Sequence, residues 1–466
     1  MENRGIPTLT IVTERFAGLG TAVAESLDRP ELPFLVIPHP FGGLPLEDIQ
    51  QRAQEVAQRL PAAIREAALQ ARQEAVQQTS SPDPAEPTQA DKSRITIDAT
   101  DTDDVSHALY GLGMTDGLPV IAPTPERVAK ALEYAGRDPA STIGPVPPEW
   151  RILELEAVAA NAVMAGCAPE AFPVVLQAVE AMMSDPAFNL YGMQTTTHPI
   201  GPMVMVCGPV ADELQVWGGI GCLGPGWRSN ATIGRAVRFV LTNGGGAHPG
   251  GMDKATMGQP GKYSFCFSEN EAESPWSPYR LDYGFKETDS TITVVGAEAP
   301  LNINDHGSTT AEGLLRTIAG TMSTTGNNNL YWLGETFLII GPEHAQSLAR
   351  EGLSKEDVKA ELHERARVPV DKMSTEQFAH LQSWIHESEV DTYVDANGSV
   401  ALVREPNDIK IVVAGGPGKH SMWVPTWFRS VTKGIVDELD RPVQSVRQLR
   451  RGEEHASEEI EVEVRA

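Results

Sequence analysis

Three histidines of this chain stand in loops whose neighbouring residues can orient them for proton transfer. His306 follows Asn304 and Asp305, and His198 directly precedes a predicted buried strand. His39 lies between two prolines at the end of another predicted strand. An imidazole changes its charge near neutral pH and acts as a general acid or base when a nearby polar group positions it. We therefore predict catalytic roles for His306, Asp305, His198 and His39.

The residues after His306 also have a purely structural interpretation. Ser308 or Thr309 can cap the helix predicted over 310–321, and Glu312 can complete a capping box. Capping explains these three side chains. It leaves the segment 304–306 without a structural role.

A glycine-rich loop over 218–226 precedes a helix predicted from residue 231. Glycines let the backbone turn its N–H groups inward, and a helix N-terminus adds positive potential, so the loop is a candidate cradle for an anion or carboxylate. Cys222 lies within it, where the amides and Arg228 would lower the pKa of the thiol and make it a nucleophile. The alternatives are a tight turn packed against the helix and an inert buried thiol.

Polar side chains of this loop and of other long loops form the predicted substrate-binding set. Amide and charged groups offer directional hydrogen bonds that suit a small polar ligand. The set comprises Gly224, Gly226, Arg228, Asn230, Lys262, Glu269, Asn270, Asn304, Asn327 and Asn328. An exposed turn is the alternative for the last two. A strand-to-loop nest over 415–421 adds Lys419 and His420 as second-rank candidates.

The chain has four cysteines, at positions 167, 207, 222 and 266. They are too few and too widely spaced for a disulfide framework or a zinc knuckle. Cys207 and Cys266 lie in apolar segments and are predicted to be core residues, whereas Cys167 is a weaker candidate than Cys222 for a reactive thiol.

Buried strands that alternate with helices predict an α/β fold. We expect a partial α/β domain over 1–78, a Pro- and Ser-rich linker over 79–101, a main α/β substrate domain with a mixed or parallel sheet over 102–440, and a charged tail over 441–466.

The N-terminal domain contains only two predicted strands, over 5–12 and 32–37, with helices over 16–27 and 46–77. Both strands are apolar and predicted to be buried on two faces, as in a doubly wound sheet. Two strands do not make a stable parallel sheet, so this unit is a partial doubly wound fragment. We expect the missing strands to come from elsewhere, with His39 facing a site shared with a partner.

The net charge of the chain limits the classes of partner that it can bind. With 37 basic and 63 acidic residues the formal net charge is −26, which disfavours nucleic acid and anionic membrane surfaces. No apolar run approaches the ~20 residues that span a bilayer, and no signal-peptide pattern is present. We expect a cytoplasmic protein.

A series of longer motifs runs through residues 5–370. They are Gly5-Ile-Pro-Thr8, Thr13-Glu-Arg-Phe16, Val36-Ile-Pro-His-Pro-Phe-Gly-Gly-Leu44, Thr115-Asp-Gly-Leu-Pro-Val120, Asn161-Ala-Val-Met-Ala-Gly-Cys167, Thr196-Thr-His-Pro199, Gly221-Cys-Leu-Gly-Pro-Gly226, Gly258-Gln-Pro-Gly-Lys-Tyr263 and Asn302-Ile-Asn-Asp-His-Gly307. This series resembles the UGSC family, named for a selenocysteine- or cysteine-Gly-Ser-Cys motif.

The resemblance implies a thiol- or selenol-dependent oxidoreductase. In the family the redox motif lies upstream of the strand that opens this chain, and no Cys-Gly-Ser-Cys occurs here. The resemblance therefore implies a hetero-oligomer. A companion polypeptide would bring the Cys- or Sec-Gly-Ser-Cys motif, and this chain would bring the pocket for a small polar or anionic substrate.

Two other functions remain open at this point. One is a metal-dependent lyase or hydrolase, in which a divalent ion is held by His198, His248, Asp305 and His306, although no HxH or HExxH spacing supports it. The other is a non-catalytic subunit that binds substrate or stabilises its partner.

Overall fold

The structure is a computed structural model that describes residues 8–26, 30, 32–39, 46–78, 97, 101–384 and 393–435. Of the predicted linker over 79–101, only residues 97 and 101 are among them. The predicted tail over 441–466 lies outside the described residues, as do the first three residues of the strand predicted over 5–12.

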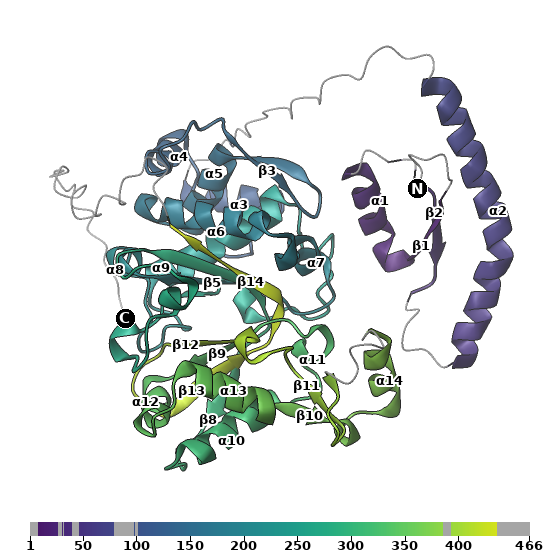
Figure 1. Cartoon of the computed structure of the whole chain (residues 1–466). Coiled ribbons are helices and arrows are strands. Elements are labelled where there is room, and N and C mark those ends of the chain that lie inside the picture. The colour runs from purple at the N-terminus through teal and green to yellow at the C-terminus, as the bar shows by residue number, and fades with distance from the viewer. Residues whose placement is uncertain are drawn as a thin grey trace.

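The N-terminal segment forms a parallel strand pair with one helix on either side (Figure 1, purple). Strands β1 (Thr10–Thr13) and β2 (Phe34–Ile37) pair in parallel, with Thr10 opposite Phe34. Helix α1 (Ala17–Ser26) packs on them so closely that a side chain at Gly20 would meet the Phe34 ring, and helix α2 (Leu46–Gln78) follows β2. The segment thus has the layering of a doubly wound sheet.

These two strands are more exposed than predicted. Ile11 is 45% exposed and Val36 is 37% exposed, so the prediction that both strands are buried on two faces is wrong within the described residues. Two strands provide too few neighbours to cover their own apolar side chains. Helix α2 contacts β2 through the Arg59 guanidinium, which donates to the Val36 carbonyl at 3.2 Å.

The main domain alternates helices and strands from residue 102 onward. Its helices are α3 (Thr102–Gly111), α4 (Pro125–Leu132), α5 (Leu155–Ala165), α6 (Phe172–Ser184), α7 (Leu190–Thr195), α8 (Pro209–Glu213), α9 (Arg228–Phe239), α10 (Ala311–Met322), α11 (Asn329–Trp332), α12 (Pro342–Arg350), α13 (Lys355–Arg365) and α14 (Thr375–Trp384). Its strands are β3 (Thr142–Val146), β4 (Arg151–Glu154), β5 (Gly201–Cys207), β6 (Cys266–Phe267), β7 (Thr291–Ala297), β8 (Leu301–Asn304), β9 (Thr336–Ile340), β10 (Arg367–Pro369), β11 (Ser399–Ala401), β12 (Ile409–Val413), β13 (His420–Val424) and β14 (Thr426–Gly434).

Two four-stranded mixed sheets organise this domain. Sheet I has the order β14-β7-β5-β6, and sheet II has the order β12-β9-β13-β8. In sheet I, β5 is antiparallel to β7 and parallel to β6. In sheet II, β9 is parallel to β12 and antiparallel to β13, which is antiparallel to β8. Two small antiparallel pairs, β3-β4 and β10-β11, lie outside these sheets.

The sheets stack face to face between two layers of helices (Figure 1). Along β5, Met203 and Met205 point into the core between the sheets, whereas Val204 and Val206 point to the core beneath α5, α6 and α9. In sheet II the residues that alternate with Phe337 and Ile339 pack beneath α10, α12 and α13 in the same way. Strands β5, β7 and β9 are therefore buried on both faces. Continuous apolar runs result from this four-layer stacking and not from parallel pairing alone.

The predicted α/β class with a mixed sheet is confirmed, but some predicted elements are not. Residues 118–121 form no strand, because their carbonyls bond elsewhere: Arg235 donates to those of Leu118 and Pro119. Thr310, not Ser308 or Thr309, caps α10 by accepting from the Gly313 N–H at 3.2 Å. Glu312 does not complete a capping box there and pairs instead with Arg365 at 2.6 Å.

Candidate functional site

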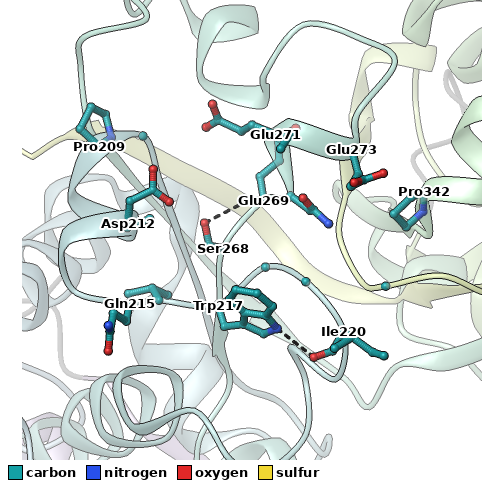
Figure 2. A pocket seen from close by; sticks show the side chains of 18 of the residues that line it. Pro209, Asp212, Gln215, Trp217, Ile220, Ser268, Glu269, Glu271, Glu273 and Pro342 are labelled. Atoms are coloured by element: carbon teal, nitrogen blue, oxygen red, sulfur yellow. Dashed lines mark hydrogen bonds between the residues drawn. The ribbon is translucent and has the colours of Figure 1, made fainter.

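Four strands from the two sheets end at one large cavity. Its lining includes Gly208 after β5, Ser268 and Glu269 after β6, Pro342 after β9 and Gly416 after β12. The cavity has a volume of about 1400 Å³ and is shown in Figure 2. Ligands of α/β proteins bind at the carboxyl ends of strands, where loops are free to vary. We call this space the strand-end cavity.

Loops that are distant in the sequence are tied together along the wall of this cavity. The Gly415 N–H donates to the Gly218 carbonyl at 2.8 Å. The Asn270 N–H donates to the Val413 carbonyl at 2.8 Å, and its side-chain amide donates to the Gly415 carbonyl at 3.0 Å. Three predicted segments therefore meet here: the start of the glycine-rich loop, the pair Glu269-Asn270 and the nest over 415–421.

The strand-end cavity is acidic. The described lining has one arginine, Arg280, and seven carboxylate side chains, those of Asp212, Glu213, Glu269, Glu271, Glu273, Glu287 and Glu343. The arginine is buried, forms an ion pair with Glu271 and donates to the Glu287 carbonyl at 2.9 Å. The positive charge of Arg280 is therefore already paired with the Glu271 carboxylate. A site with this balance repels anions, so the prediction of an anion cradle is not supported.

Glu269 is the carboxyl group of the cavity with the most altered titration. It is 6% exposed, and its Oε2 accepts the Tyr279 N–H at 2.7 Å. Burial raises the pKa of Glu269 to about 8, and the nearby charges of Glu271 and Asp282 add to this, against the opposing effects of the Tyr279 N–H and Lys355. A carboxyl with such a pKa exists in both forms near neutral pH and can serve as a general acid or base.

Trp217 supplies an aromatic surface beside these carboxylates (Figure 2). Its ring stacks on Trp227 with centroids 4.2 Å apart, and its Nε1–H donates to the Ile220 carbonyl at 2.8 Å. The ring is held in place, yet the residue remains 36% exposed. An aromatic face next to anionic groups is suited to an organic cation. Sequence reasoning missed Trp217, although its position directly before Gly218-Gly219 was the available signal.

The far part of the glycine-rich loop does not line the cavity. Gly224 and Gly226 are exposed, and Arg228 begins α9, where it donates to the Gly166 carbonyl at 3.1 Å. Asn230 is buried and bonds to the Trp217 N–H at 2.8 Å and to the Cys222 carbonyl at 3.1 Å. Arg228 and Asn230 therefore stabilise the conformation of the loop.

Cys222 is not an activated thiol in this structure. It is 5% exposed and packs in the core between the sheets. Burial raises the pKa of the Cys222 thiol to about 11, despite backbone hydrogen bonds that oppose the shift. Burial likewise raises the pKa of Cys167 to about 12, and it also raises the pKa of Cys207 and Cys266. The predicted lowering for Cys222 is wrong, because the apolar core outweighs the loop amides.

We expect all four thiols of the native protein to react slowly with iodoacetamide at pH 7. The thiolate is the reactive form, and every one of these pKa values lies well above 7. Mass spectrometry of each cysteine peptide over a pH series measures the rates, with protein unfolded in guanidinium chloride as the control. Fast labelling of Cys222 at pH 7 in the native protein would contradict this assignment.

Asp305 has a structural role in its loop. Its Oδ1 accepts the N–H groups of Gly307 and Ser308 at 3.1 and 2.8 Å, and its Oδ2 accepts the Ser308 and Thr317 hydroxyls at 2.7 and 2.6 Å. Burial alone would raise the pKa of Asp305, but these four hydrogen bonds outweigh it and lower the pKa to about 2. The carboxylate is thus fully engaged and does not orient His306.

His306 lies instead against a histidine from another strand. Its Nε2 is 3.3 Å from Nε2 of His420, the first residue of β13. Asn304 is opposite His420 in the register of β8 and β13, and its side chain is exposed. Neither histidine lines the strand-end cavity.

His198 and Lys262 lie near the opposite, amino end of β5. His198 lies three residues before the start of this strand and packs on the Trp427 ring with centroids 5.5 Å apart. Burial lowers the pKa of His198, against a hydrogen bond with Asn328. Lys262 packs over Gly201, the first residue of β5, and pairs with Asp253 at 2.7 Å. The structure does not bring these two residues to the strand-end cavity.

The asparagines at 327 and 328 are buried, so the exposed-turn alternative is wrong for them. The Asn327 side chain accepts the Leu330 N–H at 3.0 Å, and the Asn328 amide donates to the Thr426 carbonyl at 2.5 Å. Asn328 thus joins β14 to the segment before α11, whereas Asn327 bonds within its own turn, to Thr324 and Leu330. Among the described residues, both asparagines therefore have a structural role.

His39 lies at the carboxyl ends of β1 and β2, as predicted. Its Nδ1 is 3.0 Å from the hydroxyl of Thr13, the last residue of β1, and its ring packs 5.9 Å from that of Phe16. The side chain is exposed. Its catalytic role remains a prediction.

The metal-dependent alternative finds no support in the geometry. The described residues contain no group of three or more His, Cys, Asp or Glu side chains placed to hold an ion. His248 is half-buried in a turn in which its N–H donates to the Gly246 carbonyl at 2.8 Å. Asp305 is engaged in its own loop, and neither His198 nor His248 joins it.

Fold and cavity together define an α/β protein with an acidic cavity that is lined in part by the aromatic ring of Trp217. Residues 1–66 match the model of the UGSC family, which confirms the predicted resemblance for the segment with β1, α1, β2 and most of α2. The motifs between Thr115 and Gly307 lie outside that match. No curated protein and no solved structure matches the chain. Within the described residues, no helix combines the length and apolar character needed to cross a membrane.

Proposed function

We propose that this chain is the substrate-binding subunit of a thiol- or selenol-dependent oxidoreductase and that its substrate is a small organic cation. The observation that carries the proposal is the strand-end cavity, in which seven acidic residues and the Trp217 ring line a space of about 1400 Å³. We propose a cationic substrate in place of the polar or anionic one expected from the sequence. The oxidoreductase class is supported by the UGSC match over residues 1–66.

The cysteines support a nucleophile from another polypeptide. All four have thiol pKa values far above neutral, and the sequence contains no Cys-Gly-Ser-Cys. A thiol-dependent reaction therefore needs a thiolate or selenolate from outside these 466 residues. A companion bearing the Cys- or Sec-Gly-Ser-Cys motif would meet that need, and the exposed strand pair β1-β2 is a surface on which further strands can add. An adjacent reading frame encoding such a polypeptide would support this part of the proposal.

Within the cavity, Glu269 is the proposed proton donor. A thiolate or selenolate that attacks the substrate displaces a leaving group, which takes up a proton as its bond breaks. Glu269, with its pKa raised to about 8, carries that proton at neutral pH. The acidic side chains around it are proposed to hold the cationic part of the substrate.

The substrate class is tested by titration calorimetry with matched probes. We expect choline and agmatine to bind and succinate and phosphate not to bind. Glu273→Gln and Asp212→Asn each remove one exposed charge from the cavity lining. Each should weaken cation binding about fivefold, which corresponds to about 1 kcal/mol.

Glu364→Gln is the matched control, since Glu364 is exposed on α13 and does not line the cavity. It should leave cation binding unchanged. Equal binding of cations and anions, or equal effects of all three variants, would refute the cationic substrate class.

A further inference from the structure

We propose that His306 and His420 form a binding site for a divalent transition-metal ion of the zinc or nickel type, separate from the strand-end cavity. The two Nε2 atoms face each other at 3.3 Å, and the rings meet edge to face with centroids 5.1 Å apart. Both side chains are exposed, so an ion can reach them and complete its coordination with water.

The separation of the two nitrogens fits neighbouring ligands of one ion. Zinc binds imidazole nitrogen at about 2.0–2.1 Å, and at a tetrahedral angle two such nitrogens lie about 3.3–3.4 Å apart. The two nitrogens are therefore already at the spacing that one ion requires, and each ring has only to turn its lone pair from the other ring toward the ion.

Asn302 fixes the tautomer of His420 that can bind a metal ion through Nε2. Its Oδ1 lies 3.0 Å from Nδ1 of His420. An amide oxygen only accepts hydrogen bonds, so Nδ1 carries the proton and Nε2 carries the lone pair that a metal ion needs. Metal-binding histidines commonly use their second nitrogen in this way, and the partner fixes both the tautomer and the ring orientation.

The buried His344 stabilises the backbone that carries the pair. The buried His344 places Nε2 3.2 Å from the Asp305 carbonyl and Nδ1 2.8 Å from the Ser421 hydroxyl. It thus contacts the residue before His306 and the residue after His420. Together with the four hydrogen bonds to the Asp305 carboxylate, this contact fixes the spacing of the two histidines before any ion binds.

Calorimetric titration of untagged protein with Zn²⁺ and Ni²⁺ tests the proposal. We expect one ion per chain. His306→Ala and His420→Ala should each weaken binding by at least about tenfold, and Asn302→Ala should weaken it by about tenfold through loss of the oriented tautomer. His107→Ala is the matched control, because His107 is an exposed histidine on α3, and it should bind like the wild type.

Thermal unfolding without metal shows whether the variants are folded. If one of them does not fold, Cu²⁺ bound to the wild-type protein provides a second measurement, because its electron paramagnetic resonance spectrum should show coupling to two imidazole nitrogens. Absence of metal binding, unchanged affinity in both histidine variants, or a copper spectrum without nitrogen coupling would overturn the proposal. In that case the pair is an imidazole–imidazole hydrogen bond only.

Discussion

Glu269→Gln is expected to stabilise the protein at alkaline pH by about 2–4 kcal/mol and to have almost no effect near pH 4.5. The pKa of Glu269 is raised from 4.5 to about 8 in the folded protein. Between these values the folded state holds a proton that the unfolded state has released, so the stability of the wild type falls as pH rises. Above about pH 8 the buried carboxylate is ionised, and its cost is constant.

Glutamine has no charge at any pH and keeps an oxygen that can accept the Tyr279 N–H. The variant therefore escapes the cost of burying a carboxylate while it keeps the shape of the site. Urea denaturation at pH 4.5, 7 and 9 measures the difference, and Glu364→Gln controls for a change in net charge on the surface. A difference that is the same at all three pH values would show that Glu269 titrates normally.

Gly218→Ala is expected to lower the free energy of unfolding by about 3 kcal/mol. A Cβ atom at Gly218 would lie 2.4 Å from the Ser268 carbonyl oxygen and 2.7 Å from the backbone of Glu269. These are backbone atoms, so they cannot rotate away, and the loop after β6 must move. Because that loop carries Glu269, we also expect weaker binding of cationic ligands.

Gly224→Ala is the matched control for this effect. It lies in the same loop, is exposed, and would bring Cβ only to 3.3 Å from the Gly221 carbonyl oxygen. Its effect on stability should stay within about 1 kcal/mol. Equal effects of the two substitutions in chemical denaturation would show that the close approach at Gly218 does not constrain the cavity.

Much of the fold was predictable from local patterns. The apolar run over 409–413 coincides with β12, and Lys355–Arg365 forms α13 as predicted. Strand alternation predicted the α/β class, but it did not predict two stacked sheets. A strand buried between a helix layer and a second sheet has the same apolar run as a strand in a parallel sheet, so local sequence does not distinguish them.

The candidate site was predicted only in part, because local sequence does not reveal which distant segments contact a residue. Glu269, Asn270 and Gly218 were recognised as polar or glycine-rich loop residues that follow or precede strands. The assignments to Cys222 and Asp305 failed because each depended on the immediate sequence neighbours. In the folded chain, the apolar core around Cys222 and the hydroxyl of Thr317 beside Asp305 come from beyond those neighbours.

The sequence by itself determined the α/β class, the four isolated cysteines and the resemblance of its first segment to the UGSC family, because periodicity, residue identity and motifs are properties of contiguous residues. Only the tertiary structure decided that Asp212, Glu269 and Glu343 share one cavity, that the thiols are protonated, and that His306 faces His420. Burial and electrostatic potential depend on every group within several ångströms. In this protein most of those groups come from other strands and loops.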